Sequence, residues 1–146
     1  MKAEIRIKEN IIEDYAVIYT KEVTAEVRQL ASLIEGYSFK TLITVTHNGR
    51  FITLRPDEIF MVRVENEKTV VYSNDKKFSC SKRLYEMEAL LGNEFIRISK
   101  STIVNLHSLD YAEVSLGGLM LLVLKNGCKD YVSRRYLSDF KKHLGI

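Results

Sequence analysis

The chain has 146 residues, 46% of them hydrophobic, and a net charge of +3, which suits one globular domain or one domain with a short extension. A single proline, seven glycines and no biased tract exclude a disordered protein and a long linker. No apolar run approaches the ~20 residues of a membrane span, and the charged N-terminus lacks the core of a signal peptide, so we expect a cytoplasmic protein.

Residues 1–40 predict a small ββα unit. Apolar and charged residues alternate over residues 3–8, and residues 14–20 are a second β-rich run. A helix ending at Gly36 is predicted next, because apolar residues recur on one helical face: Val23, Val27, Leu30, Ala31 and Ile34. A unit this small can hardly bury its own apolar stripe, so we expect it to dock on the rest of the chain or on another copy.

Short strands and tight turns dominate residues 41–132. One helix is expected over residues 82–91, with Ser81 as its N-cap and Gly92 at its end. About ten strands without regular strand–helix alternation indicate a mainly β domain. The strands are separated by turn signals at Asn48-Gly49, Asn66-Glu67, Asn74-Asp75, Gly117-Gly118 and Asn126-Gly127.

Two features of the strands bear on the interior of the domain. In the apolar run of residues 119–124, we expect Leu121 and Val123 to lie on one buried face. Truncating either to alanine would then cost about 1–4 kcal/mol of stability. Cys80 and Cys128 also fall in predicted strands, and we expect free thiols rather than a disulfide.

A polar break divides the segment FIRISKSTIVNL, residues 95–106. Its apolar residues supply core, and Ser99, Lys100, Ser101 and Thr102 interrupt them. Hydroxyls and a lysine at a strand break suit phosphate and base-edge contacts. On this segment alone, an ordinary polar turn is the simpler interpretation.

A C-terminal helix is predicted over residues 133–144, and the charges at its start are unusual. Ser133 is a good N-cap, Gly145 is a stop signal, and apolar residues recur at helical spacing: Leu137, Phe140 and Leu144. Arg134 and Arg135 occupy the first turn, at the positive pole of the helix dipole, where a cation costs roughly 0.3–1 kcal/mol. From Phe95 onward, eight Lys and Arg stand against four acids, an excess compatible with nucleic acid.

The sequence contains no catalytic or metal-binding constellation. Asp57 and Glu58 are adjacent, so on a strand they would face opposite ways and could not act as an acid–base pair. Nucleophile motifs and phosphate-binding glycine loops are absent. Three scattered histidines and two distant cysteines do not fit a zinc site. We therefore expect no enzyme, no metal and no cofactor.

Three stretches, in this order, resemble the LytTR DNA-binding domain family. They are RPDEIFMVRVENEKTVVYS, KRLYEMEALLGNEFIRISKSTIVNLHSLD and LKNGCKDYVSRRYLSDFKKHL. The resemblance covers about residues 41–144, and its most specific parts are the F-x-R to V-N-L block and the terminal V-S-R-R-Y. It implies a LytTR-like domain, residues 41–146, of about ten strands in three small antiparallel sheets, with a short helix between and a C-terminal helix. Residues 1–40 would precede it as a dimerisation or regulatory extension.

The resemblance also implies a function and a site. Proteins of this family are sequence-specific transcriptional regulators that bind double-stranded promoter DNA as pairs and insert loops into successive major grooves. By position, the first loop runs from Asn66 to Thr69, with Lys68 nearest the base-contacting position. The positive end of the C-terminal helix would form an anion site for phosphates and a guanine edge. The second and third loops would hold Ser99, Lys100 and Ser101, and Ser133, Arg134 and Arg135.

This sequence departs from the family pattern in three respects. Arg63 stands where the family often has glutamate, and Ser99-Lys100 where it commonly has histidine followed by arginine or asparagine, so the operator sequence cannot be carried over. The usual upstream receiver domain, of about 120 residues, does not fit into forty. The chain instead resembles compact regulators that are often encoded beside a small membrane protein, so we expect a homodimer, a small membrane regulatory partner, or both.

Two other classes of function remain open. An RNA-binding β module would need exposed aromatic side chains for base stacking, whereas most aromatic residues here fall at predicted core positions. A protein-interaction module controlled by a membrane partner would bind DNA only secondarily. A specific, salt-sensitive complex with duplex DNA would distinguish the regulator from both.

Overall fold

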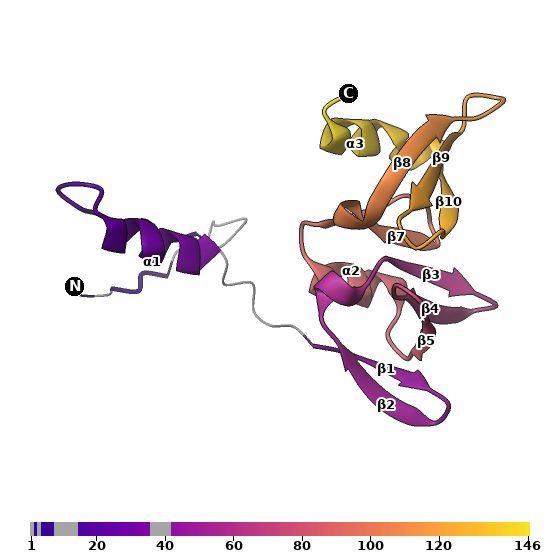
Figure 1. Cartoon of the computed structure of the whole chain (residues 1–146), viewed down its shortest axis with the longest axis horizontal. Coiled ribbons are helices and arrows are strands. Elements are labelled where there is room, and N and C mark those ends of the chain that lie inside the picture. The colour runs from indigo at the N-terminus through magenta and orange to yellow at the C-terminus, as the bar shows by residue number, and fades with distance from the viewer. Residues whose placement is uncertain (1, 3, 8–14, 36–41) are drawn as a thin grey trace. The chain divides into compact units, whose positions relative to one another are not determined.

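The computed structural model describes residues 2, 4–7, 15–35 and 42–146, and the chain divides into two compact units, residues 1–39 and 40–146. Figure 1 shows the helix of the first unit and the strands of the second. Among the described residues, no helix is long and apolar enough to cross a membrane.

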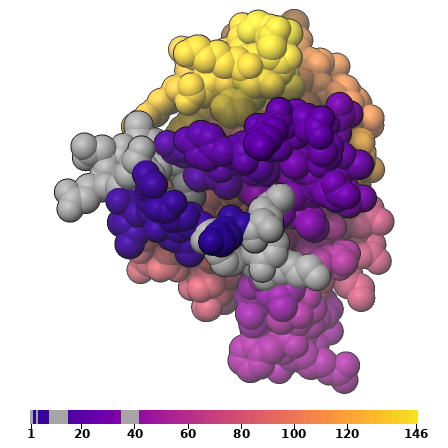
Figure 2. Space-filling model, turned by 90° about the vertical axis from the view of Figure 1, so that its left-hand side faces the viewer, coloured from indigo at the N-terminus to yellow at the C-terminus, as the bar shows by residue number. Residues whose placement is uncertain are grey.

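The N-terminal unit contains one described helix, α1, Ala25–Glu35. It begins after Thr24, whose hydroxyl accepts the Val27 N–H at 3.3 Å, and this confirms a helix here. Its predicted end at Gly36 lies outside the described residues. Residues 4–7 and 15–20 form neither helix nor strand, so the two predicted strands are wrong there, and residues 3, 8 and 14 lie outside the described residues. Two short strands are marginal without further strands to pair with. In the unit drawn indigo to purple in Figure 2, Val23, Leu33 and Ile34 are exposed.

Ten antiparallel strands build the second unit (Figure 1). Seven form one sheet in the order β2-β1-β5-β4-β3-β7-β6, and three form another in the order β10-β9-β8. The first sheet consists of β1 (Ile43–His47), β2 (Arg50–Leu54), β3 (Met61–Glu65), β4 (Lys68–Tyr72), β5 (Lys77–Cys80), β6 (Phe95–Arg97) and β7 (Thr102–Asn105). The second consists of β8 (Leu109–Val114), β9 (Met120–Leu124) and β10 (Lys129–Val132).

The strand number agrees with the prediction, but the number of sheets does not. Three sheets were expected and two are found, because the β1–β2 hairpin joins β5 through the single residue pair Thr46↔Ser79. A hairpin held to its neighbour at one position is nearly a separate sheet. The difference therefore rests on one bridge.

Two helices complete this unit, α2 (Leu84–Leu91) and α3 (Arg134–Leu144). Arg83 is the N-cap of α2, and its N–H donates to the Glu86 carboxylate at 3.0 Å. The predicted cap at Ser81 is thus wrong by two residues, because the helix begins after Arg83, whose carbonyl accepts the Glu86 N–H at 3.0 Å. The predicted end of α2 at Gly92 is confirmed by its φ of 78°.

The first sheet separates two apolar cores. One core lies on the α2 face and includes Val62, Val71 and Met87. The other joins the opposite face to β9 and α3 through Met61, Leu122 and Phe140. Two short 3₁₀ turns, Pro56–Glu58 and Leu106–Ser108, link strands at the rim.

Strand β9 corrects one predicted face. Met120, Leu122 and Leu124 belong to the second core, Leu121 is half-buried, and Val123 is buried outside that cluster. The prediction that Leu121 and Val123 share the core face is therefore wrong by one residue. Every residue of the run is apolar, so the sequence contains no polar position to show which alternate residues face the core.

Asn105 explains the asparagine of the V-N-L block. It is 2% exposed, its amide donates to the Ile59 carbonyl at 3.0 Å, and its side-chain oxygen accepts the His107 N–H at 3.0 Å. Both polar atoms are thus satisfied in the interior. This residue ties the segment before β3 to the turn that follows β7.

Candidate nucleic-acid interface

The β3–β4 turn presents the first predicted loop. Glu65 and Lys68 form the last strand pair, and the two residues between them, Asn66 and Glu67, have φ values of 48° and 65°. Left-handed backbone at both central positions is the pattern of a type I′ hairpin turn. Asn66, Glu67 and Lys68 are all exposed.

Replacing Glu67 with glycine should stabilise the protein. A glutamate held at φ 65° carries a steric cost that glycine avoids, so we expect a gain of about 0.5–1 kcal/mol in the free energy of unfolding. Urea denaturation measures it. Glu67→Ala is the matched control, because it removes the same carboxylate and keeps the steric cost. An equal gain in both variants would attribute the effect to charge and contradict the backbone argument.

The β6–β7 loop, which holds Ser99, Lys100 and Ser101, is fixed by Arg97. Its guanidinium donates from Nε to the Ser99 carbonyl at 3.1 Å and from Nη2 to the Lys100 carbonyl at 2.6 Å. A third nitrogen pairs with Glu88 of α2 at 2.9 Å. Within the loop, the Ser99 hydroxyl accepts the Ser101 N–H at 3.2 Å. The loop backbone is thus held from inside, and the side chain of Lys100 is exposed.

Helix α3 begins as predicted. Ser133 is its N-cap in extended conformation, and Gly145 ends it with a φ of 72°. The Ser133 hydroxyl makes no capping hydrogen bond, so it remains available to a ligand. Arg134 and Arg135 are exposed on the first turn, and the Arg135 guanidinium lies 5.9 Å from the centre of the Tyr136 ring.

Two backbone hydrogen bonds bring the three predicted loops together. The Val64 N–H donates to the Ser101 carbonyl at 2.8 Å, which joins the end of β3 to the β6–β7 loop. The Ser133 N–H donates to the Ile98 carbonyl at 2.8 Å, which joins the same loop to the start of α3. Segments some seventy residues apart in sequence therefore form one continuous surface.

An ionic cluster centred on Arg63 lies next to these loops, since the neighbouring Val64 is bonded to Ser101. Its guanidinium pairs with Glu65 at 2.7 Å and with Asp130 at 3.5 Å, and it donates to the Tyr72 hydroxyl at 2.9 Å. The Tyr72 hydroxyl in turn donates to Glu65. Burial alone would lower the pKa of Arg63, but the hydrogen bonds with Glu65 and Tyr72 raise it, so this side chain stays charged.

Sequence reasoning noticed Arg63 only as a departure from the family pattern. The structure shows that it ties two sheets together, because Asp130 belongs to β10 and also accepts the Thr102 hydroxyl at 2.7 Å. One signal was available: Arg63 and Glu65 are two residues apart on a strand, so they share a face. Asp130, distant in sequence, gave no such signal.

The acidic side chains near the surface are largely engaged in ion pairs, whereas the exposed basic side chains are not. Glu65, Asp130 and Glu88 are held by Arg63 and Arg97. Within residues 42–146, no ion pair involves Lys68, Lys100, Arg134 or Arg135, and all four are exposed. The exposed Glu67 is the exception. Arg63 and Arg97 leave one of the three carboxylates uncompensated, so two negative charges, Glu67 included, stand against four unpaired cations, and the net positive charge attracts anions.

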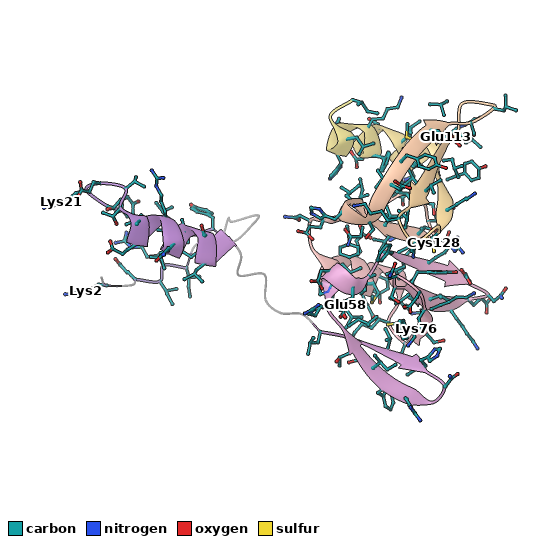
Figure 3. The ribbon with its side chains drawn as sticks, viewed as in Figure 1. Lys2, Lys21, Glu58, Lys76, Glu113 and Cys128 are labelled. Atoms are coloured by element: carbon teal, nitrogen blue, oxygen red, sulfur yellow. The ribbon has the colours of Figure 1, made fainter. Side chains whose placement is uncertain are left out.

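Two further features concern the cysteines and the possible metal ligands. Cys80 and Cys128 are free, and burial raises the pKa of the Cys128 thiol, which Figure 3 labels. Among the described residues, no group of His, Cys, Asp and Glu could hold a metal ion.

Known proteins resemble this chain over most of its length. Residues 49–145 match the LytTr DNA-binding domain family. Two uncharacterized HTH-type transcriptional regulators of Staphylococcus aureus, from strains NCTC 8325 and COL, are each 28% identical over 146 residues, which is 100% of this chain and 99% of theirs. A solved chain, described as the LytTr DNA-binding domain of a methyl-accepting/DNA response regulator from Bacillus cereus, is 28% identical with a TM-score of 0.69. The match covers 73% of this chain and 99% of that one.

The abbreviation HTH denotes a helix-turn-helix, which the second unit does not contain within its described residues. Its two α-helices, α2 and α3, are separated by the five strands β6 to β10. A helix-turn-helix needs two helices joined by a turn of three or four residues. The candidate interface of residues 42–146 therefore consists of loops and one helix end.

Proposed function

This chain belongs to the LytTR DNA-binding domain family. On that premise we propose that it is a transcriptional regulator that binds double-stranded DNA sequence-specifically. The observation that carries the proposal is the joining of three loops into one surface with four unpaired cations. Phosphates attract such a surface whatever the sequence, and side chains on loops read base edges in the major groove. A protein with this function acts in the cytoplasm, where promoter DNA lies.

Each loop has a distinct role in the proposed complex. The start of α3 binds a phosphate through its free N–H groups and the Ser133 hydroxyl, and Arg134 reads a guanine edge. Lys100 and Arg135 contact phosphates, and Ser99 and Ser101 supply hydroxyls beside them. Asn66 and Lys68 of the β3–β4 turn reach the neighbouring part of the groove. A pair of such surfaces would engage successive major grooves of repeated promoter sites.

A titration with duplex DNA tests this function. The probe is the labelled region upstream of the protein's own gene, with a scrambled duplex and a single-stranded RNA of equal length as competitors. We expect a complex that the scrambled duplex and the RNA displace only at large excess, and whose affinity falls steeply with salt. Equal displacement by RNA would favour an RNA-binding β module. Absence of any DNA complex would favour a protein-interaction module.

We further propose that residues 1–40 pair two copies of the chain or bind a small membrane regulatory partner. Two observations support this: the apolar residues Val23, Leu33 and Ile34 of this unit are exposed, and the relatives align with the whole chain, this extension included. Pairing two DNA modules raises their effective concentration on repeated sites, so affinity should rise by about 10²-fold or more.

Light scattering and operator titration on the full chain and on residues 42–146 test the pairing. We expect a dimer with tight binding to repeated sites for the full chain, and a monomer with weak binding for the shorter one. Substituting Val23 and Leu33 by serine in the full chain should likewise give a monomer with weak binding. Two monomers of equal affinity would contradict pairing and leave the membrane partner as the role of the extension.

A further inference from the structure

Two more cations lie at the sheet end that carries the β3–β4 turn. The register pairs Thr69 with Cys80, so β5 ends beside the start of β4, and the chain leaves the sheet there. The next residues are Ser81, Lys82 and Arg83, and α2 begins at Leu84. Arg83 is exposed and Lys82 is half-buried. Within residues 42–146, no ion pair involves either of them.

The strand order aligns these residues with the candidate interface. From β5 the sheet continues through β4 and β3 to β7. Neighbouring strands lie about 4.8 Å apart, so the end of β5 is about 10 Å from β3 and about 14 Å from β7. The β3–β4 turn lies between β5 and β7, the β6–β7 loop lies at β7 and at the same sheet end, and α3 begins next to that loop. The cations therefore follow one edge from the start of α2 to the start of α3.

The local acids do not cancel this charge. The Glu86 carboxylate, which accepts the N–H of Arg83, can offset only one of the two cations, and Glu88 is paired with Arg97. As at the start of α3, cations stand at the positive end of a helix, where they cost stability unless an anion lies nearby. Phosphates of one DNA strand are spaced about 3.4 Å apart along the helix axis. An edge of about 14 Å thus spans roughly four base-pair steps.

We propose that Lys82 and Arg83 bind the phosphate backbone of the duplex beyond the base pairs that the three loops contact. The proposal rests on the proposed DNA-binding function and adds a flanking contact to it. Contacts to phosphates carry no base information, so this pair contributes affinity and orientation on the DNA, whatever the flanking sequence.

The test compares two variants on two duplexes. Lys82→Gln combined with Arg83→Gln removes both charges and keeps most of each side chain. The control is Lys76→Gln, which removes an exposed cation just before the other end of β5 (labelled in Figure 3). Melting curves confirm that all proteins are folded. One duplex holds the operator alone, and the other extends it by about six base pairs on each side.

On the long duplex, we expect the Lys82/Arg83 variant to bind about 10-fold more weakly than wild type at low salt, whatever the flanking sequence. The slope of log affinity against log salt should be shallower by about 0.9 for each phosphate that the variant no longer neutralises. On the short duplex, wild type and variant should bind alike, and Lys76→Gln should match wild type on both. Equal binding of wild type and variant on the long duplex would overturn this inference alone. A wild type that binds no duplex would overturn the proposed function with it.

Discussion

Arg134→Ala should weaken operator binding by about 5- to 150-fold and leave the protein as stable as wild type or slightly more so. Removing a bidentate hydrogen bond to guanine costs about 1–3 kcal/mol and relaxes the preference for one base pair. The exposed Arg134 has no ion pair with a described residue, so its removal breaks no ion pair, and the helix dipole no longer opposes a cation. Operator titrations at two salt concentrations and melting curves on the same samples measure both effects.

Two comparisons sharpen this result. Lys141→Ala makes the same charge change at the other end of α3, where a cation is favourable, so it should lower stability slightly and leave binding nearly intact. Lys100→Ala should weaken binding to all DNA sequences alike. It should also make the slope of log affinity against log salt shallower by about 0.9. If Arg134→Ala melts lower and still binds the operator normally when folded, Arg134 is a structural residue and α3 does not present its start to DNA.

Phe140→Ala should cost about 3–5 kcal/mol of stability. Phe140 is 0% exposed and is the largest fully buried side chain of the unit, at the centre of the core between α3, β9 and the first sheet. Alanine would leave a cavity that the two sheets cannot close, because the Arg63 cluster and paired strands hold them in place. Urea denaturation monitored by circular dichroism gives the free energy.

Leu144→Ala, one turn further along the same helix, is the matched control. Leu144 is 36% exposed, so its truncation should cost under about 1 kcal/mol. Operator binding of Phe140→Ala should fall only in proportion to the unfolded fraction, and excess DNA should restore folding by mass action. A stable, folded Phe140→Ala would mean that α3 is not anchored by this side chain.

The sequence predicted those parts of the fold that depend on neighbouring residues. The turns at Asn48-Gly49 and Asn66-Glu67 lie where expected, because asparagine tolerates the left-handed backbone that the first central position of each turn requires. The end of α2 at Gly92 and the start of α3 at Ser133 are confirmed because glycine and serine suit the backbone of helix ends. Local chemistry fixed these boundaries.

The errors concern what distant residues decide. Nothing local indicates whether β1 bridges β5 at Thr46, or which face of β9 meets α3. Likewise, the Arg63 cluster needs Asp130, sixty-seven positions further along the chain. The β propensity of residues 4–7 and 15–20 predicted strands that these described residues do not form, because propensity alone does not supply a strand to pair with.

The candidate loops were placed by resemblance, and the structure adds how they are joined. Position in the family pattern named Lys68, Lys100 and Arg134, but the hydrogen bonds that link Val64 to Ser101 and Ser133 to Ile98 follow only from the folded chain. Arg97 was noted only as part of a motif. Its hold on two loop carbonyls gives that motif a physical reason.

The hydrogen bonds from Arg97 to the β6–β7 loop also affect the rate and the selectivity of ligand binding. A backbone already held at Ser99 and Lys100 loses little conformational entropy on binding. Association should then be limited by diffusion and charge steering rather than by folding of the loop. A rigid loop cannot remould itself to a poor site, so tolerance for variant sites must come from long, mobile side chains such as Lys100. For mismatched sites, we therefore expect a faster dissociation rate and a nearly unchanged association rate.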